Sequence, residues 1–149
     1  MLLDRNKQEK LIAVAKRAHN WTGFVKRENQ ANYLIGSAQL SDSSNVFIPG
    51  LTMEIEIKAP IHVERCLFLF TLRQRLTGKR PRIYQLDVCP RDKRSHNGDP
   101  VIYGPHEHFF DEEVHAVVDN GVNCENWRSS LSWFLRQANI LDMNVEWPC

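Results

Sequence analysis

Two histidines and an aspartate carry the strongest chemical signal in the chain. His106 and His108 are two positions apart, and on a strand such side chains share one face, roughly 6–7 Å from each other. A pair of this kind chelates a metal ion or places an acid and a base around one scissile bond. Asp87, in the preceding apolar stretch, is expected to orient an imidazole or to complete a ligand set. A third alternative, in which both rings are merely solvated, stays open beside these two.

The positive charge of the chain is concentrated just before these histidines. Residues 73–94 hold eight Lys or Arg and two Asp, a net charge of +6, whereas the whole chain carries +1. Residues 106–127 hold six Asp or Glu and no Lys or Arg. A basic cluster of this size binds phosphates or an acidic partner, although solvated strands also collect such residues by chance. The candidate binding residues are Arg73, Arg75, Arg80, Arg82, Arg91, Lys93 and Arg94.

The length and composition indicate an ordinary globular protein. The chain has 149 residues, of which 42% are hydrophobic and 25% are charged, as in average soluble domains. We expect one domain over residues 1–149. No apolar run reaches the 18 residues of a membrane span, and the first residues resemble no export signal. These observations predict a cytoplasmic protein. The four cysteines are Cys66, Cys89, Cys124 and Cys149. We expect free thiols, because no CxxC pair suggests a zinc site and, without an export signal, cytosolic thiols are kept reduced.

Hydrophobic periodicity predicts an α+β fold. A helix is expected from Asp4 to about Ala18, and an amphipathic helix is expected after Asn123, with Trp127 on its packing face and Trp133 outside it. Between them an antiparallel sheet of about five or six strands is expected. Tyr84, Leu86 and Val88 share one face of a strand in this sheet, so Asp87 points away from them. The expected strands cover residues 23–26, 33–40, 52–58, 66–72, 82–88 and 101–110.

A resemblance adds a specific expectation to this pattern. The chain resembles a group of small bacterial and mobile-element proteins and, more distantly, the TumE type of toxin in toxin–antitoxin pairs. Its similar motifs, over about residues 80–140, are Tyr84-x-Leu86-Asp87, His96-Asn97-Gly98-Asp99, Gly104-Pro105-His106-x-His108-Phe109 and Phe134-Leu135-x-x-x-Asn139-Ile140. The resemblance implies roles for Asp87, His96, His106 and His108. The chain departs from the toxin pattern in lacking an arginine directly before Tyr84 and in having one loop histidine instead of two.

Two classes of function follow. The first is a toxin-like endoribonuclease in which His106 and His108 supply acid and base, Asp87 and His96 complete the catalytic set, and arginines bind phosphate. It needs no metal and no cofactor. Its expected partners are RNA and a cognate antitoxin protein, and no membrane. The alternative is a non-enzymatic interaction module of a mobile element, which binds another protein or forms a homodimer through exposed tryptophans such as Trp133.

Overall fold

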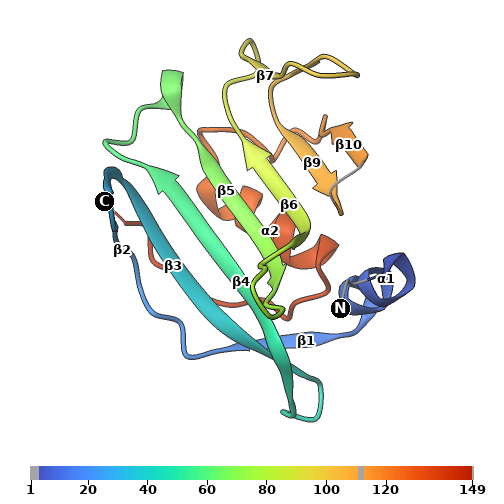
Figure 1. Ribbon diagram of the computed structural model, residues 1–149. Helices are drawn as coiled ribbons and strands as arrows, with labels where there is room; N and C mark the ends of the chain where they lie inside the picture. Colours follow the sequence, from blue (N-terminus) through green and yellow to red (C-terminus); the bar gives the residue numbers. More distant parts are fainter. Residues whose placement is uncertain (1–3, 111–112, 149) are drawn as a thin grey trace.

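The computed structural model describes residues 4–110 and 113–148, which form an antiparallel sheet and two helices (Figure 1). Within these residues the main sheet has eight strands in the order β1-β3-β4-β5-β6-β9-β10, with β2 also pairing with β3. The α+β class is therefore confirmed, with more strands than the five or six expected.

The elements are α1 (Arg5–Ala13), β1 (Lys16–His19), β2 (Val25–Arg27), β3 (Gln30–Asp42), β4 (Phe47–Lys58), a 3-10 turn (Val63–Arg65), β5 (Phe68–Gln74), β6 (Arg82–Val88), β7 (Arg94–His96), β8 (Ile102–Tyr103), β9 (His106–Phe109), β10 (Glu113–Ala116) and α2 (Trp127–Gln137).

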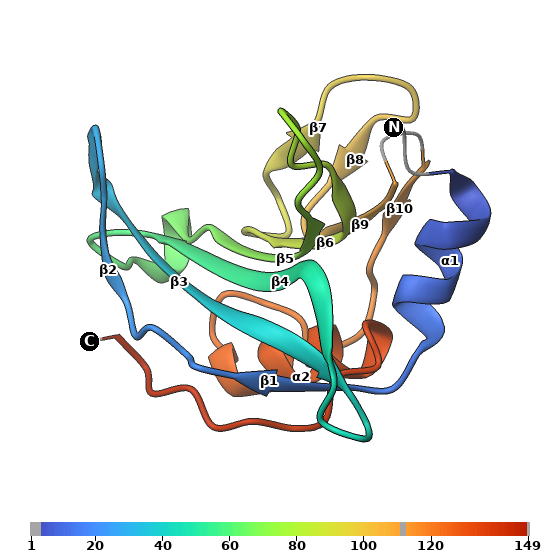
Figure 2. The ribbon, with the colours of Figure 1, turned by 60° about the horizontal axis from the view of Figure 1, so that its bottom comes forward.

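One face of the sheet packs against α2 and forms the hydrophobic core (Figure 2). Alternate residues of β5 and β6 point to this face, because side chains of a strand alternate between its two sides. The ring of Phe134 in α2 stacks on Phe70 and on Tyr84, with ring centroids 5.6 and 5.8 Å apart. Trp127 packs against Phe68 and Phe70 at the start of the helix. This packing fixes which residues of β6 face the core and which face away.

The opposite face of the sheet is polar. Glu54 of β4, Thr71 of β5, and Gln85 and Asp87 of β6 alternate with the core residues of their strands. The hairpin of β7 and β8, in the chain between β6 and β9, rises on this side, away from α2 (Figure 2). The polar face therefore lies beneath a short hairpin. The side chain of Asp87 is directed to this face.

The N-terminal helix is shorter than expected, because a buried lysine ends it. The side chain of Asp4 accepts a hydrogen bond from the Lys7 backbone, as an N-cap does, but the helix stops at Ala13. Nζ of Lys16 donates to the backbone carbonyls of Leu11, Ile12 and Val14, which are orphan acceptors of the last turn. Residues Lys16–His19 then form β1 and pair with β3, instead of continuing the helix.

The expectation of four free cysteines is wrong for two of them. Cys66 and Cys124 form a disulfide, with Cα atoms 5.7 Å apart and a sequence separation of 58. The sequence spacing does not indicate this bond, because the segment before β5 and the segment before α2 meet only in the folded chain. Cys89 is a buried free thiol, and Cys149 lies outside the described residues. Disulfides persist in oxidising surroundings, so this one does not support the cytoplasmic expectation.

The described residues contain no helix with the length and apolarity needed to span a membrane. Two members of the acidic segment, Asp111 and Glu112, and the first three residues lie outside the described part of the chain. Glu113, another member of the acidic segment, forms an ion pair with Arg5, and its carboxylate lies 3.7 Å from Nε2 of His115.

Candidate active site

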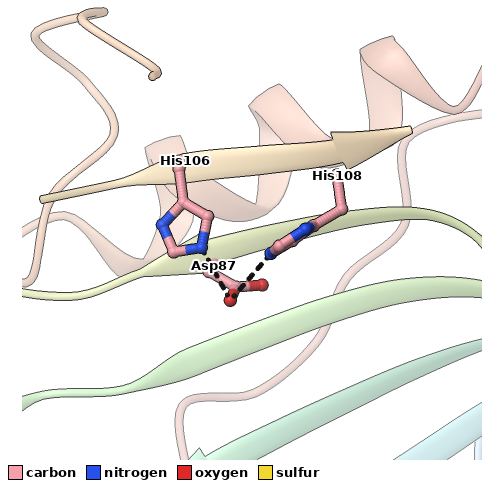
Figure 3. A group of neighbouring side chains, drawn as sticks. All are labelled: Asp87, His106 and His108. Atoms are coloured by element: carbon pink, nitrogen blue, oxygen red, sulfur yellow. Dashed lines mark ion pairs between the residues drawn. The ribbon is translucent and has the colours of Figure 1, made fainter. Parts of the chain in front are cut away.

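Asp87, His106 and His108 meet on the polar face, as the sequence predicts. In the antiparallel pairing of β6 with β9, Asp87 lies opposite His106, and Gln85 lies opposite His108. Nε2 of His106 is 3.1 Å from Oδ2 of Asp87, and Nε2 of His108 is 3.5 Å from the same oxygen. Figure 3 shows both imidazoles directed toward this carboxylate. The two rings are 4.8 Å apart, so the three side chains form one compact group.

His106 is held as a buried imidazolium. Its Nδ1 lies 3.2 Å from the carbonyl of Gly104, which only accepts hydrogen bonds, so Nδ1 carries a proton. Its Nε2 faces the carboxylate of Asp87. Burial opposes the charged ring, but hydrogen bonds to Asp87 and Cys89 outweigh it and raise the pKa of His106 to about 10. Because both nitrogens are engaged and the residue is 3% exposed, His106 acts as a fixed positive charge.

The carboxylate of Asp87 is ionised despite its surroundings. Burial favours its neutral form, yet the hydrogen bonds from His106 and His108 more than offset this and lower its pKa. Its other oxygen, Oδ1, is buried and has no hydrogen-bond partner among the described residues. The pair of Asp87 and His106 is thus a buried ion pair that joins two neighbouring strands.

The guanidinium of Arg82 determines which ring nitrogen of neutral His108 carries the proton. Nη2 of Arg82 lies 3.3 Å from Nδ1 of His108, and guanidinium nitrogens only donate hydrogen bonds. Nδ1 must therefore carry the lone pair, which places the proton of the neutral ring on Nε2, toward Asp87. An imidazole with a carboxylate behind its N–H and a lone pair on the other nitrogen is the arrangement of a general base with its orienting group.

His96 approaches the group from the β7–β8 hairpin. Its ring centroid is 6.3 Å from that of His106 and 6.1 Å from that of His108. Its Nδ1 donates to the carbonyl of Pro100 at 2.7 Å, which leaves Nε2 to carry the lone pair or a second proton. His96 is partly exposed, unlike the two histidines of β9. The structure therefore brings together all four predicted catalytic residues.

The predicted phosphate-binding residues separate into two sets. Arg82 joins the histidine group directly, and Arg73 and Arg80 lie beside it on the polar face, where both pair with the buried carboxylate of Glu54. Since one carboxylate balances two guanidiniums, this patch keeps a positive charge. No hydrogen bond or ion pair within the described residues joins the other set to Asp87 or the histidines: Arg75, Arg91, Lys93 and Arg94.

The same three side chains have the types and the proximity of a metal site. One ligand atom from each of Asp87, His106 and His108 lies within 4.8 Å of the others, and two histidines with one carboxylate hold divalent transition metals in other proteins. Coordination through Nε2 of His108 requires the proton on Nδ1, where Arg82 donates its own N–H. The guanidinium would also repel a dication. The hydrogen-bond directions therefore favour proton chemistry over a metal.

Comparisons with known proteins add no information about the site. No family model, curated protein or solved structure matches the chain. The resemblance to TumE-type toxins accordingly remains an expectation from motifs.

Sequence reasoning missed the residues that hold these groups in place. Gln85 accepts a hydrogen bond from Arg82 at 2.9 Å and donates one to Thr71 at 2.7 Å, so its amide links β5 to the histidine group. Gly104 supplies the carbonyl for His106 from a backbone with φ +80°, a conformation that favours glycine. The signal for Gln85 was present in its spacing, two residues before Asp87 on the same face of β6.

The tryptophans of α2 do not form the exposed surface that an interaction module was expected to use. Trp133 is partly buried and packs against the core, and its indole nitrogen is inaccessible to solvent. Trp127 is enclosed by aromatic rings that include Trp147, which is 38% exposed. The expectation that Trp133 is exposed is wrong, because its side chain packs against the hydrophobic core although it lies outside the stripe of Trp127.

Proposed function

We propose that the protein cleaves RNA at the polar face of its sheet by metal-free acid–base chemistry. The observation that supports this most directly is the ordered contact Arg82–His108–Asp87. It leaves one imidazole nitrogen as a lone pair and holds a carboxylate behind the other. An oriented base beside arginines suits abstraction of a proton near a phosphate group.

The roles of the histidines follow from their hydrogen bonds. Nδ1 of His108 accepts the proton of a ribose 2′-OH, while Asp87 stabilises the imidazolium that forms, in the same way as in other carboxylate–histidine pairs. The 2′ oxygen attacks phosphorus, the bond from phosphorus to the 5′ oxygen breaks, and His96, when protonated, returns a proton to that oxygen through Nε2. The products are a 2′,3′-cyclic phosphate and a 5′-OH end. No water and no metal enters this step.

His106 takes a different role from the one expected of it. Its positive charge lies beside His108, with the two ring centroids 4.8 Å apart, and stabilises the negative charge that develops on the phosphorane. Arg82 and the patch of Arg73 and Arg80 around Glu54 hold the neighbouring phosphates. RNA is the proposed substrate because this mechanism uses the 2′-OH as its nucleophile. A cognate antitoxin protein stays a prediction from the resemblance.

The test is cleavage of a single-stranded RNA oligonucleotide and of the same oligonucleotide with one 2′-deoxy position. We expect cleavage at ribose positions only, with 2′,3′-cyclic ends detected by mass spectrometry. His108→Ala is expected to lower the rate about 10²–10⁴-fold, the usual contribution of acid–base catalysis. His115→Ala is the matched control, because His115 is an exposed histidine on β10, outside the group. It should cleave like the wild type.

Two further outcomes separate the alternatives. Cleavage that EDTA abolishes and Zn²⁺ or Mn²⁺ restores would make Asp87, His106 and His108 metal ligands. The absence of cleavage on all RNAs, with the fold intact by circular dichroism, would reject the ribonuclease and leave the interaction module as the better account.

A further inference from the structure

A directional chain of hydrogen bonds runs across three strands and ends at the base. Nε2 of Gln85 donates to Thr71, Oε1 of Gln85 accepts from Nη1 of Arg82, and Nη2 of Arg82 donates to Nδ1 of His108. His108 then directs its Nε2–H toward Asp87. Each bond fixes the direction of the next, because the guanidinium has no acceptor and the amide has one donor end and one acceptor end.

This chain places the base in a blocked state when no substrate is bound. The lone pair on Nδ1 of His108, which must accept the proton, already accepts a hydrogen bond from Arg82. The residue that blocks the base is at the same time the one suited to bind a phosphate through two parallel N–H groups.

We propose that a phosphodiester group binds the guanidinium of Arg82, withdraws it from Nδ1 of His108 and so exposes the lone pair that acts as the base. The proposal rests on the proposed function and names its regulation: the substrate itself unblocks the site. Gln85 is then a positioning residue. It holds Arg82 beside His108 until an anion with two or more oxygens competes for the guanidinium.

The positions of the two partners support this exchange. Arg82 begins β6, its side chain is partly exposed, and it lies at the margin of the group, whereas His108 is 7% exposed. A ligand arriving over the polar face therefore meets Arg82 before His108. In the antiparallel pairing of β5 with β6, Arg73 lies opposite Arg82. The guanidinium of Arg73 forms an ion pair with Glu54. The two arginines thus flank the place where a phosphate would bind.

The experiment follows the imidazole nitrogens of His108 by ¹⁵N NMR, using inorganic phosphate and an uncleavable 2′-deoxy dinucleotide as probes. In the free protein we expect a protonated Nε2 and an Nδ1 shifted by hydrogen bonding. Each probe should move the Nδ1 signal in a saturable way, and chloride at equal ionic strength should not. Arg82→Met should show the unblocked signal from the start and no response to phosphate.

The control is Arg136→Met, which removes an exposed arginine of α2, on the opposite side of the sheet from the polar face, and should respond like the wild type. The proposal is wrong if phosphate or the dinucleotide leaves the Nδ1 signal unchanged, if chloride moves it equally, or if Arg82→Met responds as the wild type does. Since neither probe is cleaved, the result is independent of ribonuclease activity. A normal response without RNA cleavage would overturn the proposed function and keep the anion-dependent exposure of His108.

Discussion

Oδ2 of Asp87 lies 3.1 Å from Nε2 of His106, and this buried contact connects the carboxylate of β6 to the imidazolium of β9. The ion pair does two things. It holds the two strands in the register that places His108 beside Arg82, and it keeps a full positive charge on His106 near neutral pH.

Removing the carboxylate of Asp87 is expected to destabilise the protein. Asp87→Asn keeps the shape but leaves the imidazolium of His106 without its counter-charge. Losing one partner of a buried pair costs about 3–5 kcal/mol. Urea denaturation measures this change. Asp142→Asn, which breaks the exposed pair with Arg128, should cost less than about 1 kcal/mol. Equal losses in both variants would show that the buried pair contributes little.

The charge on His106 predicts how stability depends on pH. Its pKa is about 10 in the folded protein and about 6.5 in an unfolded chain. Its contribution is therefore complete below pH about 6.5 and is lost as the pH rises to about 10. The groups facing it are Asp87, Cys89, His108 and His96.

The measurement is the difference in unfolding free energy between the wild type and His106→Gln across this pH range. We expect the difference to shrink from pH 6.5 to 10. Lys16 has the opposite effect on stability. Burial lowers its pKa to about 8 in the folded protein, so its contribution to the free energy of unfolding increases as the pH rises above 8. It is present in both proteins and cancels in the difference. A difference that is constant with pH would mean that His106 is neutral in the folded state.

The glycine before β9 is expected to resist substitution. A Cβ at Gly104 would lie 3.0 Å from Cα of Arg91, and its φ is +80°. Gly78→Ala is the matched control, since Gly78 has a φ of +72° and nothing within 4 Å of its Cβ position. Both variants pay about 1–2 kcal/mol for the left-handed backbone. Only Gly104→Ala should lose more stability than this and shift the His106 signals. Equal stability of the two variants would argue against a tight contact.

Reduction of the disulfide should lower stability without unfolding the site at once. Closing a loop of 58 residues stabilises a protein by about 4 kcal/mol in the chain-entropy model. We therefore expect dithiothreitol to lower the unfolding free energy of the wild type and to leave Cys124→Ala unchanged. Cys89→Ala, which keeps the disulfide, should respond to dithiothreitol like the wild type. A wild type that does not respond would show that the disulfide does not form in solution.

The sequence predicts the parts of this structure that local pattern controls. The period-two alternation of β6 places Asp87 opposite its apolar neighbours, and the His-x-His spacing predicts one shared face for His106 and His108; both are confirmed. Long-range pairing is not contained in such patterns. β7, β8 and β10 are only two to four residues long, so their pairing depends on neighbouring strands. The disulfide and the hydrogen bonds of Gln85 depend on contacts between segments that are distant in sequence.

The disulfide has a topological consequence for the site. Asp87, His96, His106 and His108 all lie between Cys66 and Cys124, so the proposed catalytic residues belong to one covalent ring. A single cut in the exposed hairpin at residues 97–100 opens this ring but leaves both pieces of the chain attached to each other. A protease that nicks the hairpin would therefore produce a molecule of unchanged mass apart from one added water. Only reduction would then separate Asp87 and His96 from the two histidines of β9.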